Sequence, residues 1–439
     1  MARHVKSLRG SPLDEIGAIW VGMLDLDREE GMIETVGSLQ PRHSEARILI
    51  RIHGAPIGYV QVSTTPRDTL ADRARTVALE SLADAIASHD RWDNRAKQAD
   101  EWRSEAPWAS CPHAFPAPDG TGITVAVCTR DRTSELVTHC IPALQRSTYE
   151  PFEILIVDNS SSGDATKSAV AAITRQDSRV RYIREPVGGL SMARNRALAS
   201  AKFDLVAFTD DDAIPDVGWV AAVAAAFMLD PRAACVTGPL IPAALDTEYQ
   251  RYFQARYSWG EEFEPRRYNL DTHRHSSRLY PFSAGIFGAG ANFAVNRRVA
   301  IEVDGFDPLL GAGSLGRGGE DLDMFLRLIL AGCIIDFVPS AIVFHRHRID
   351  MQALMEQTYS YGHGLGAYLS KHMGNDEFRA ALRSCAFQQS KAALGRIREA
   401  SQLSHLRGAG GKLALAEVRG LLAGAVRYHR AVRGRRPRP

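Results

Sequence analysis

The chain has 439 residues, of which 45% are apolar and 24% are charged, and its formal net charge is +2. This composition is typical of soluble globular proteins and excludes a globally disordered chain, while the length suggests about two or three domains. The small net charge gives no electrostatic reason to expect a nucleic acid as partner.

The cysteines and the apolar stretches favour a cytoplasmic protein. No Cys-X-X-Cys spacing occurs, and Cys128, Cys235 and Cys333 lie in apolar stretches that we interpret as buried strands. Reduced core residues explain them better than a disulfide framework or a zinc site. Residues 1–9 are basic but no apolar run follows, so we expect no signal peptide. The longest apolar stretch, Trp219–Leu229, is about half of a bilayer span, so membrane contact would be peripheral, at the inner face.

Residues 1–105 are predicted to form a small α+β module. Arg47–His53 and Ile57–Val62 alternate between apolar and polar residues around a turn at Gly54–Pro56, which predicts a β-hairpin. Leu70–Ser88 then has the spacing of an amphipathic helix. Because no catalytic set converges in this module, we expect a structural or partner-binding role rather than an enzymatic one.

A proline-rich linker is predicted over residues 106–121, and residues 122–348 then alternate between strands and helices. The predicted strands are Ile123–Thr129, Phe152–Asp158, Val180–Glu185 and Leu205–Asp210. The predicted helices between them are Glu135–Arg146, Asp164–Arg175 and Leu190–Ala201. The alternation predicts an α/β fold with a mostly parallel sheet and helices on both faces. In such sheets, ligands bind beyond the carboxyl ends of the strands.

Residues 349–439 are predicted to be a helical segment with a basic tail. Six apolar residues fall roughly on one helical face: Leu413, Leu415, Val418, Leu421, Leu422 and Val426. Arginines follow them to the end of the sequence. Two interpretations stay open, a helix that lies on anionic lipid and a helix that packs on the preceding domain with a solvated tail.

Three consecutive acids, Asp210, Asp211 and Asp212, come at the end of an apolar strand. Adjacent like charges repel one another unless a cation neutralises them. Mg²⁺ and Mn²⁺ take carboxylate oxygens together with substrate phosphates. A solvated acidic turn is the alternative, but other acids at neighbouring strand ends favour a metal site.

At this point the sequence resembles the family 2 glycosyltransferases of the GT-A fold, which use nucleoside-diphosphate sugars. The motifs that carry the resemblance are, in chain order, Val127–Arg132, Val157–Ser161, Gly188–Asn195, Thr209–Asp212, Gly305–Asp307, Gly319–Asp321 and His345–His347. No single motif is specific, but their order is. The resemblance covers about half of the chain and reaches neither residues 1–105 nor the part beyond about Ile349.

The resemblance implies a donor site at the first two strand ends. Asp158 would contact the base or ribose, because a carboxylate accepts from such donors, and Thr129 would lie beside the nucleotide. Arg130 stands where many family members have an aromatic residue, so its guanidinium would stack on the base, and Arg132 belongs to the same donor site. Arg194, in the first turns of a helix, either contacts phosphate or is an ordinary surface arginine.

The resemblance also implies the metal ligands. Asp210 would meet the ribose or the metal, Asp211 would belong to the donor site, and Asp212 would bind the metal that bridges the diphosphate. His345, after the predicted strand Ile342–Phe344, would be a further ligand, and we prefer it to His347, two residues on.

The acceptor hydroxyl must lose a proton, and Asp321, at the start of the predicted helix Leu322–Ala331, resembles the family's general base. Glu320 would orient the acceptor or cap the helix. Gly311–Gly319 lacks the Gly-Lys-Ser/Thr ending of a P-loop and is predicted to be a mobile lid. The expected reaction is an inverting displacement with Mg²⁺ or Mn²⁺, and the acceptor is an unidentified glycan or lipid-linked molecule.

Two other functions compete with this one. A sugar-nucleotide pyrophosphorylase would need a glycine-rich phosphate loop at the first strand, and Cys128–Arg132 contains no glycine. A catalytically inactive scaffold would have no need of all the acids and the histidine together. Acceptor choice falls to Pro239–Gly285 and the flanking regions, where Tyr252, Tyr257 and Trp259 either stack on a sugar or pack internally.

Overall fold

The computed structural model describes residues 17–27, 33–89, 120–147, 149–257, 259–261, 263–384 and 409–435. Residues 1–9, all but the last two residues of the predicted linker over 106–121, and the final part of the basic tail, residues 436–439, lie outside these ranges. Cys111 and Cys385 also lie outside them.

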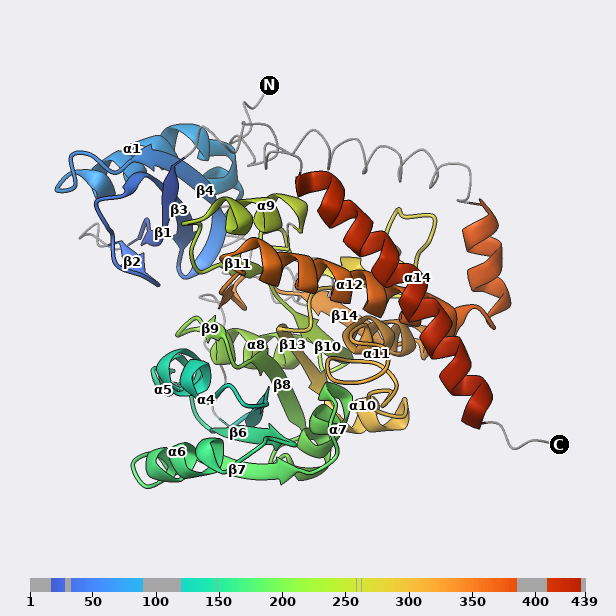
Figure 1. Ribbon diagram of the computed structural model, residues 1–439. Coiled ribbons are helices and arrows are strands. Elements are labelled where there is room, and N and C mark those ends of the chain that lie inside the picture. Colours follow the sequence, from blue (N-terminus) through green and yellow to red (C-terminus); the bar gives the residue numbers. More distant parts are fainter. Residues whose placement is uncertain are drawn as a thin grey trace.

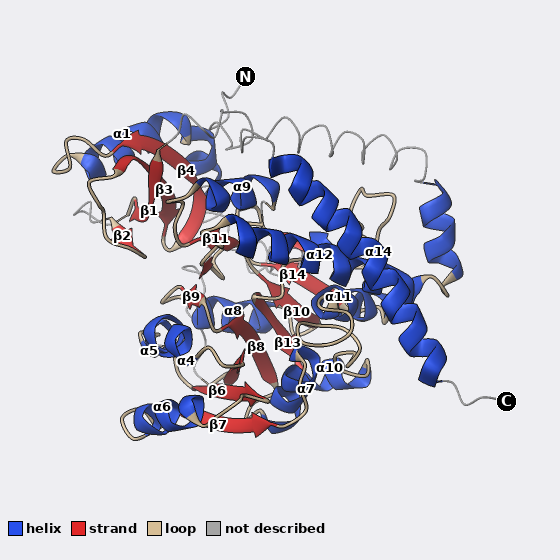
Figure 2. Ribbon diagram, in the orientation of Figure 1, coloured by secondary structure: helices blue, strands red, loops and turns tan. Residues whose placement is uncertain are grey.

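An eight-stranded sheet forms the centre of the molecule, with the strand order β12-β14-β10-β13-β8-β5-β6-β7 (Figures 1 and 2). Its strands are β5 (Ile123–Thr129), β6 (Phe152–Asn159), β7 (Val180–Glu185), β8 (Leu205–Asp210), β10 (Ala233–Thr237), β12 (Arg266–Tyr268), β13 (Asn292–Asn296) and β14 (Ile334–Phe337). The pairs β8–β5, β5–β6, β6–β7 and β10–β14 are parallel, whereas β13 runs antiparallel to both β8 and β10. The predicted α/β class and the mostly parallel sheet are confirmed.

Helices cover both faces of this sheet because its strands are apolar on both faces. In β6, Ile154 and Ile156 pack into one core with Trp219, while Leu155 and Val157 pack into the other core. The helices are α4 (Thr133–Glu135), α5 (Ile141–Gln145), α6 (Ala165–Thr174), α7 (Leu190–Ser200), α8 (Trp219–Leu229), α10 (Arg297–Glu302) and α11 (Glu320–Leu330). Helix α9 (Glu248–Arg256) packs instead against the helix over Met351–His372.

Two predicted helices differ in detail from the observed ones. The helix expected over Leu70–Ser88 is interrupted at Leu82, after α1 (Leu70–Ser81). The segment Glu135–Arg146 consists of α4, a π-helical turn over Leu136–Cys140, and α5. Pro142 lies at the start of α5 and has no backbone N–H, so the hydrogen-bond pattern of one continuous helix cannot run through it.

A second, three-stranded sheet joins the acid cluster to the predicted histidine. It has the order β11-β15-β9, with β9 (Ala213–Pro215), β11 (Leu240–Pro242) and β15 (Val343–His345). Strand β9 follows Asp212 directly, and in its antiparallel pairing with β15 Ala213 lies opposite His345. The predicted strand Ile342–Phe344 is thus shifted by one residue, and His345 is its last member. This register places His345 next to the acids that precede β9.

The described part of the N-terminal module is a four-stranded sheet with helix α1 packed on it (Figure 1, blue). It contains β1 (Ala18–Asp25), β2 (Glu34–Thr35), β3 (His43–Ile52), β4 (Ala55–Ser63) and α1 (Leu70–Ser81). The predicted hairpin is confirmed as β3–β4, but β1, which pairs in parallel with β3, was not predicted. Met23, Leu49 and Tyr59 pack against Ile241 and Phe344 of the small sheet, so the module covers the outer face of β11 and β15.

Two long helices, α12 (Met351–His372) and α14 (Ala409–Arg435), follow the last strand and confirm the predicted helical segment. They cross in close contact (Figure 2). A Cβ atom on Gly366 would lie 2.0 Å from the carbonyl oxygen of Leu421, and one on Gly424 would lie 1.9 Å from that of His363. Only glycine permits this approach. None of the described helices combines the length and the apolar composition that a membrane span needs.

Candidate functional site

The carboxyl end of β8 and the end of β15 form a cluster of metal-ligating groups. Asp210, Asp212 and His345 each offer one ligand atom, and these atoms lie within 4.8 Å of one another. His345 Nε2 is 3.6 Å from Asp212 Oδ1. Carboxylate oxygens with one imidazole nitrogen suit Mn²⁺ or Mg²⁺, so these residues fit the metal that the sequence predicts.

The acids of this cluster are crowded and poorly solvated. Burial raises the pKa of Asp210 to about 7, and the nearby Asp212 adds to the rise. Burial also raises the pKa of Asp211 to about 6, although Arg132 opposes it. The Thr129 hydroxyl donates to Asp211 Oδ2 at 2.7 Å, which ties the end of β5 to the cluster. Such a group of carboxylates is stabilised in its charged form by a cation.

Two arginines flank the cluster, one predicted and one missed. The Arg132 guanidinium donates to Asp212 at 2.9 Å and lies 2.9 Å from Asp211. Arg348 Nη1 lies 3.6 Å from Asp212, with 38% of its side chain exposed. Arg348 was not predicted from the sequence because it follows the last recognised motif. Only the pairing of β15 places Arg348 next to the acid cluster. Both side chains are exposed enough to meet a charged ligand.

His347 lies behind His345 rather than among the metal-ligating atoms. The two Nδ1 atoms are 3.3 Å apart, and His347 Nε2 is 3.0 Å from the side-chain oxygen of Gln254. Both rings are buried, and burial lowers the pKa of each below its usual range, so His345 is available as a neutral ligand.

Asp321 lies on the opposite flank, at the start of α11. It is partly exposed, while the preceding Glu320 is buried and accepts from Arg194 at 2.9 Å. Burial raises the pKa of Glu320 to about 7, although Arg194 opposes it. A Cβ atom on Gly290 would lie 2.8 Å from Asp321 Oδ2, so a glycine lets the neighbouring loop approach the carboxylate. Arg194 is therefore not an ordinary surface arginine: its partners are Glu320 and the carbonyl of Gly290.

Asp158, at the end of β6, is fully buried. Its carboxylate accepts from the Tyr182 hydroxyl at 2.7 Å and from the Ser161 hydroxyl. A carboxylate has about four acceptor positions, so two remain for a ligand. Arg130, at the start of the loop after β5, is exposed.

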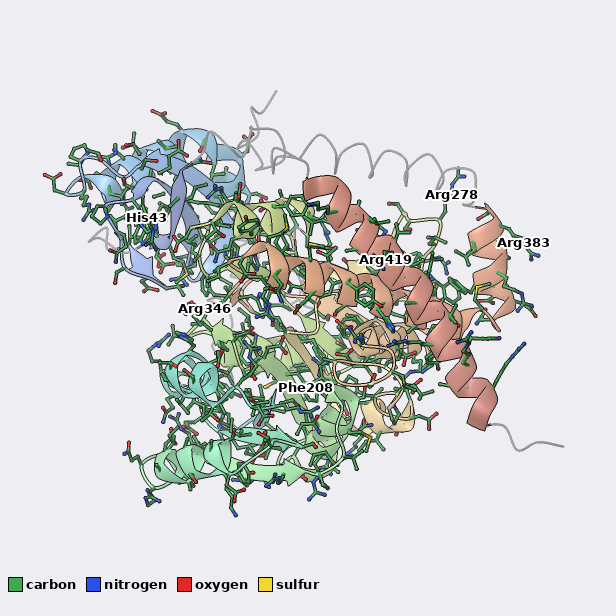
Figure 3. All side chains as sticks on the ribbon, viewed as in Figure 1. His43, Phe208, Arg278, Arg346, Arg383 and Arg419 are labelled. Atoms are coloured by element: carbon green, nitrogen blue, oxygen red, sulfur yellow. The ribbon has the colours of Figure 1, made fainter. Side chains whose placement is uncertain are left out.

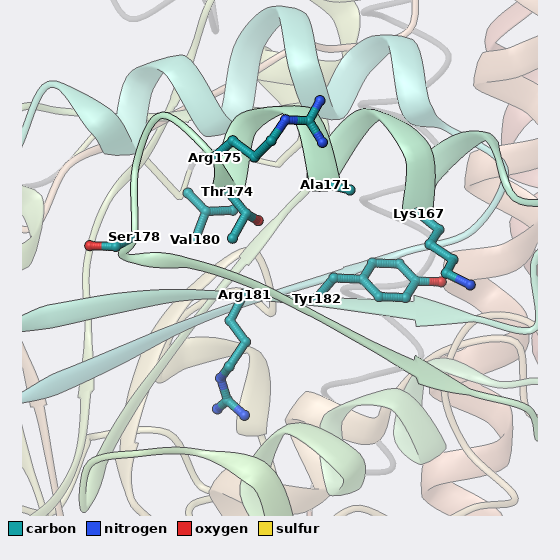
Figure 4. Close-up of a pocket in the computed structure, with 8 residues that line it drawn as sticks. All are labelled: Lys167, Ala171, Thr174, Arg175, Ser178, Val180, Arg181 and Tyr182. Atoms are coloured by element: carbon teal, nitrogen blue, oxygen red, sulfur yellow. The ribbon is translucent and has the colours of Figure 1, made fainter.

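A surface pocket between α6 and β7 contains none of the predicted site residues (Figure 4). It is lined by Lys167, Ala171, Thr174, Arg175, Ser178, Val180, Arg181 and Tyr182. Its link to the site is indirect and runs through the Tyr182 hydroxyl that donates to Asp158.

The glycine-rich segment, expected as a mobile lid, is closely hydrogen-bonded in this structure. The backbone of Gly311 bonds to that of Gly318, and His363 of α12 approaches the Gly316 carbonyl at 2.9 Å. Gly319 has a left-handed backbone with φ 82°, and a Cβ atom there would lie 2.8 Å from the Gly364 carbonyl. The segment thus holds the start of α11 against α12.

Aromatic side chains from α9, from the residues just after it and from α12 pack together. Tyr252 is buried, and Tyr257 stacks on Trp259 with ring centroids 5.5 Å apart, so these residues pack with one another. Tyr361 of α12, which sequence reasoning missed, packs edge-on against both rings. Its hydroxyl accepts from the Gln357 side chain at 3.3 Å. Burial raises the pKa of Tyr361, and the charges of Asp210 and Asp321 contribute to the rise.

A segment that contains the three acids matches a known protein family. Residues 124–300 match the family model described as Glycosyl transferase family 2. The chain is 29% identical over 184 residues to the pre-mycofactocin glycosyltransferase of Mycobacterium tuberculosis, with 42% of this chain and 36% of the relative covered. It is 26% identical over 215 residues to N-acetylgalactosaminyltransferase 7 of Drosophila melanogaster, with 46% and 35% covered. The match thus spans about a third of the length of these relatives.

Solved structures were compared as well. The mannosyltransferase PcManGT from Pyrobaculum calidifontis, in complex with GDP-Man and Mn²⁺, aligns with a TM-score of 0.47 and 17% identity over 81% of this chain and 98% of that one. Residues 1–349 of S. aureus TarS in complex with UDP-GlcNAc align with a TM-score of 0.38 and 13% identity over 72% and 93%. The segment that matches the Glycosyl transferase family 2 model thus includes β6 to β8, nearly all of β5 and the three acids.

Proposed function

We propose that this protein transfers a sugar from a nucleoside-diphosphate sugar to an acceptor hydroxyl, with inversion at the anomeric carbon. The observation that carries the proposal is the cluster of Asp210, Asp212 and His345. The two acids lie at the end of β8, inside the segment that matches the Glycosyl transferase family 2 model, and His345 lies at the end of β15. A cation in this cluster would be Mn²⁺ or Mg²⁺, and it would offset the charge that develops on the departing diphosphate.

The donor would be held by groups at the ends of β5, β6 and β8. Asp158 has two acceptor positions left for a base or ribose, and Thr129 and Asp211 complete the floor of the site. Arg132 and Arg348 flank the acids and are partly exposed, so their guanidinium groups are available to the diphosphate. Arg130 would lie on the base.

Asp321 would act as the general base. As the acceptor oxygen forms its bond to the anomeric carbon, the bond from that carbon to the diphosphate oxygen breaks. The acceptor proton passes to the Asp321 carboxylate, and the electron pair of the broken bond leaves with the nucleoside diphosphate. Arg194 would act through Glu320, since their buried ion pair holds the start of α11 and thereby the position of Asp321.

A nucleotide screen tests this proposal and separates it from an inactive scaffold. We expect UDP, GDP or dTDP to raise the melting temperature more with Mn²⁺ than without it, and the matching nucleotide sugar to be hydrolysed slowly in the absence of acceptor. Nucleotide binding without turnover would favour the scaffold. Formation of nucleotide sugar from a nucleoside triphosphate and a sugar phosphate would favour a pyrophosphorylase. The absence of any nucleotide effect would contradict all three functions.

We also propose that the acceptor is a glycan or a lipid-linked molecule reached from a membrane surface, because of the outer face of α14. One face of this helix packs on α12, as one of the two interpretations of the sequence expected. The opposite face exposes Leu415 (57%), Val418 (45%), Leu422 (60%) and Val426 (48%). The exposed charged residues of the helix are basic, and Arg419 is among them (Figure 3). Exposed apolar and basic side chains on one helix suit an anionic lipid surface.

Co-sedimentation with vesicles tests this contact. We expect binding to vesicles that contain phosphatidylserine at low salt, weaker binding at high salt, and a marked loss of binding for Leu415→Ser combined with Leu422→Ser. Both positions face away from α12, so the fold should persist, which circular dichroism checks. Failure of the wild-type protein to bind at low salt would remove the membrane from the proposal. A dimer in solution that the double variant disrupts would assign the face to a second copy of the chain.

A further inference from the structure

A continuous line of hydrogen bonds leads from the N-terminal module to the candidate metal ligand His345. Arg47 of β3 donates to both carboxylate oxygens of Glu261, at 2.8 and 2.7 Å. The side-chain nitrogen of Gln254 in α9 donates to Glu261 Oε1 at 2.9 Å. The side-chain oxygen of Gln254 is 3.0 Å from His347 Nε2, and His347 Nδ1 is 3.3 Å from His345 Nδ1. Except for Glu261, these side chains are buried.

The direction of each hydrogen bond in this line follows from chemistry. The Glu261 carboxylate only accepts, so the group of Gln254 that faces it must be the NH₂ group, and the Gln254 oxygen must face His347. An amide oxygen also only accepts, so His347 Nε2 carries a hydrogen and donates to it. The other partner of the His347 ring is a second imidazole, so a neutral His347 leaves its Nδ1 as an acceptor. His345 Nδ1 must then carry a hydrogen.

We propose that Arg47, Glu261, Gln254 and His347 are positioning residues that hold His345 in its Nδ1–H tautomer, with the bare Nε2 facing Asp212. The inference rests on the proposed metal site, where Nε2 is the nitrogen 3.6 Å from Asp212. A metal-ligating histidine usually has its second nitrogen fixed by such a partner, and loss of the partner typically costs about 10–100-fold in metal affinity or activity.

According to this inference, the N-terminal module helps to position the metal-ligating residues. Arg47, Leu49 and Arg51 alternate along β3 and share the face that meets the rest of the chain. Arg51 contacts Asp216 at 3.0 Å, just after β9, which follows the acid cluster. Two arginines of one strand thus reach both chain segments that carry the metal-ligating groups, the acids through β9 and the histidine through the line of hydrogen bonds.

Long-range ¹H–¹⁵N correlation spectra of the metal-free protein, labelled with [¹⁵N]histidine, test the tautomer directly. His345→Gln assigns the signal. We expect His345 to be protonated at Nδ1 and His347 at Nε2. A wild-type His345 that carries its hydrogen on Nε2 would overturn the inference whatever the metal affinity is. A His345 with the expected tautomer in a protein that binds no Mn²⁺ would support the line of hydrogen bonds but contradict the proposed function.

Calorimetric titration with Mn²⁺ alone tests the consequence. Gln254→Leu keeps the size and removes the acceptor of His347, and we expect the dissociation constant for Mn²⁺ to rise about 10–100-fold. Glu261→Gln keeps the shape and still offers a carbonyl, so its effect should be smaller. Arg256→Gln is the matched control on the same helix, because its partner is Glu417 of α14, and it should leave Mn²⁺ affinity unchanged. Equal affinity in Gln254→Leu and wild type would contradict the inference.

Discussion

The two flanks of the site use the same residue type in opposite surroundings. At the end of β8, Asp210, Asp211 and Asp212 are crowded together, and burial raises the pKa of the first two. At the start of α11, Asp321 is partly exposed, and the buried ion pair between Glu320 and Arg194 lies directly behind it. A cation would stabilise the charged form of the first group, whereas Asp321 is a partly exposed carboxylate beside an ion pair.

Because all of these residues are aspartates, the difference in their expected roles must come from their surroundings. Carboxylates that repel one another in a poorly solvated place bind a metal, which removes the repulsion. A single carboxylate that keeps its water can exchange a proton with a substrate. Variants that separate donor binding from the rate of transfer therefore test the comparison.

The largest effect on transfer is expected from Asp321→Asn. The amide keeps the shape of the side chain but cannot take the acceptor proton, so the transfer rate should fall about 10²–10⁴-fold. Nucleotide affinity and its dependence on Mn²⁺ should change little, because the donor groups lie on the other flank. Steady-state transfer and nucleotide titration on the same preparation measure both quantities.

Glu320→Gln is the matched comparison one residue earlier. It removes the charge from a buried ion pair, so we expect a lower melting temperature together with a smaller loss of transfer than in Asp321→Asn. If Glu320→Gln abolished transfer while Asp321→Asn retained it, the roles of the two acids would be exchanged. Full activity in both variants would place the base elsewhere.

An intermediate effect is expected for Arg348→Gln on the metal flank. A hydrogen bond to a charged group contributes about 1.5–3 kcal/mol, so the affinity for nucleoside diphosphate should fall about 10–100-fold. Arg346→Gln is the control, since Arg346 contacts His139 at 2.7 Å rather than the acids (Figure 3). Equal losses in the two variants would show that Arg348 acts only through general positive charge.

The smallest effect is a pH dependence of metal stabilisation. The pKa of Asp210 is about 7 in the folded protein and has an ordinary value of 3.8, so between these values the folded state binds more protons than the unfolded state. The contribution of Asp210 to stability therefore falls as the pH rises toward 7. Mn²⁺ binds the ionised form, so the rise in melting temperature on adding Mn²⁺ should be larger at pH 8 than at pH 6. An equal rise in melting temperature at both pH values would contradict the raised pKa of Asp210.

Sequence patterns predicted the elements whose signal is local. The bounds of β5, β7 and β8 agree with the predicted strands, because the signal for each strand lies within its own few residues. Strand β1 was missed because its partner β3 and the face it covers are distant in sequence. The antiparallel strand β13, which lies between β8 and β10, was missed for the same reason.

The residues of the candidate site also divide into those with a local sequence signal and those placed by long-range contacts. The acids and Asp321 stand in motifs, so their residue types could be singled out from the sequence. Arg348 and Tyr361 enter the site only through the register of β15 and the packing of α12, and no local pattern marks them. The buried partners of Asp158 and Arg194 are likewise long-range contacts, and for Arg194 they change the expected role from phosphate contact to a fixed ion pair with Glu320.

The central claim is that Asp212 with Asp210 and His345 holds a divalent metal that couples to the nucleotide. Calorimetric titration of UDP, GDP and dTDP, with and without Mn²⁺, into the wild-type protein and Asp212→Ala tests it most directly. We predict that Mn²⁺ strengthens binding of one nucleotide to the wild-type protein and that this enhancement is lost in Asp212→Ala, while circular dichroism shows an intact fold. Equal Mn²⁺ enhancement in the two proteins would contradict the claim.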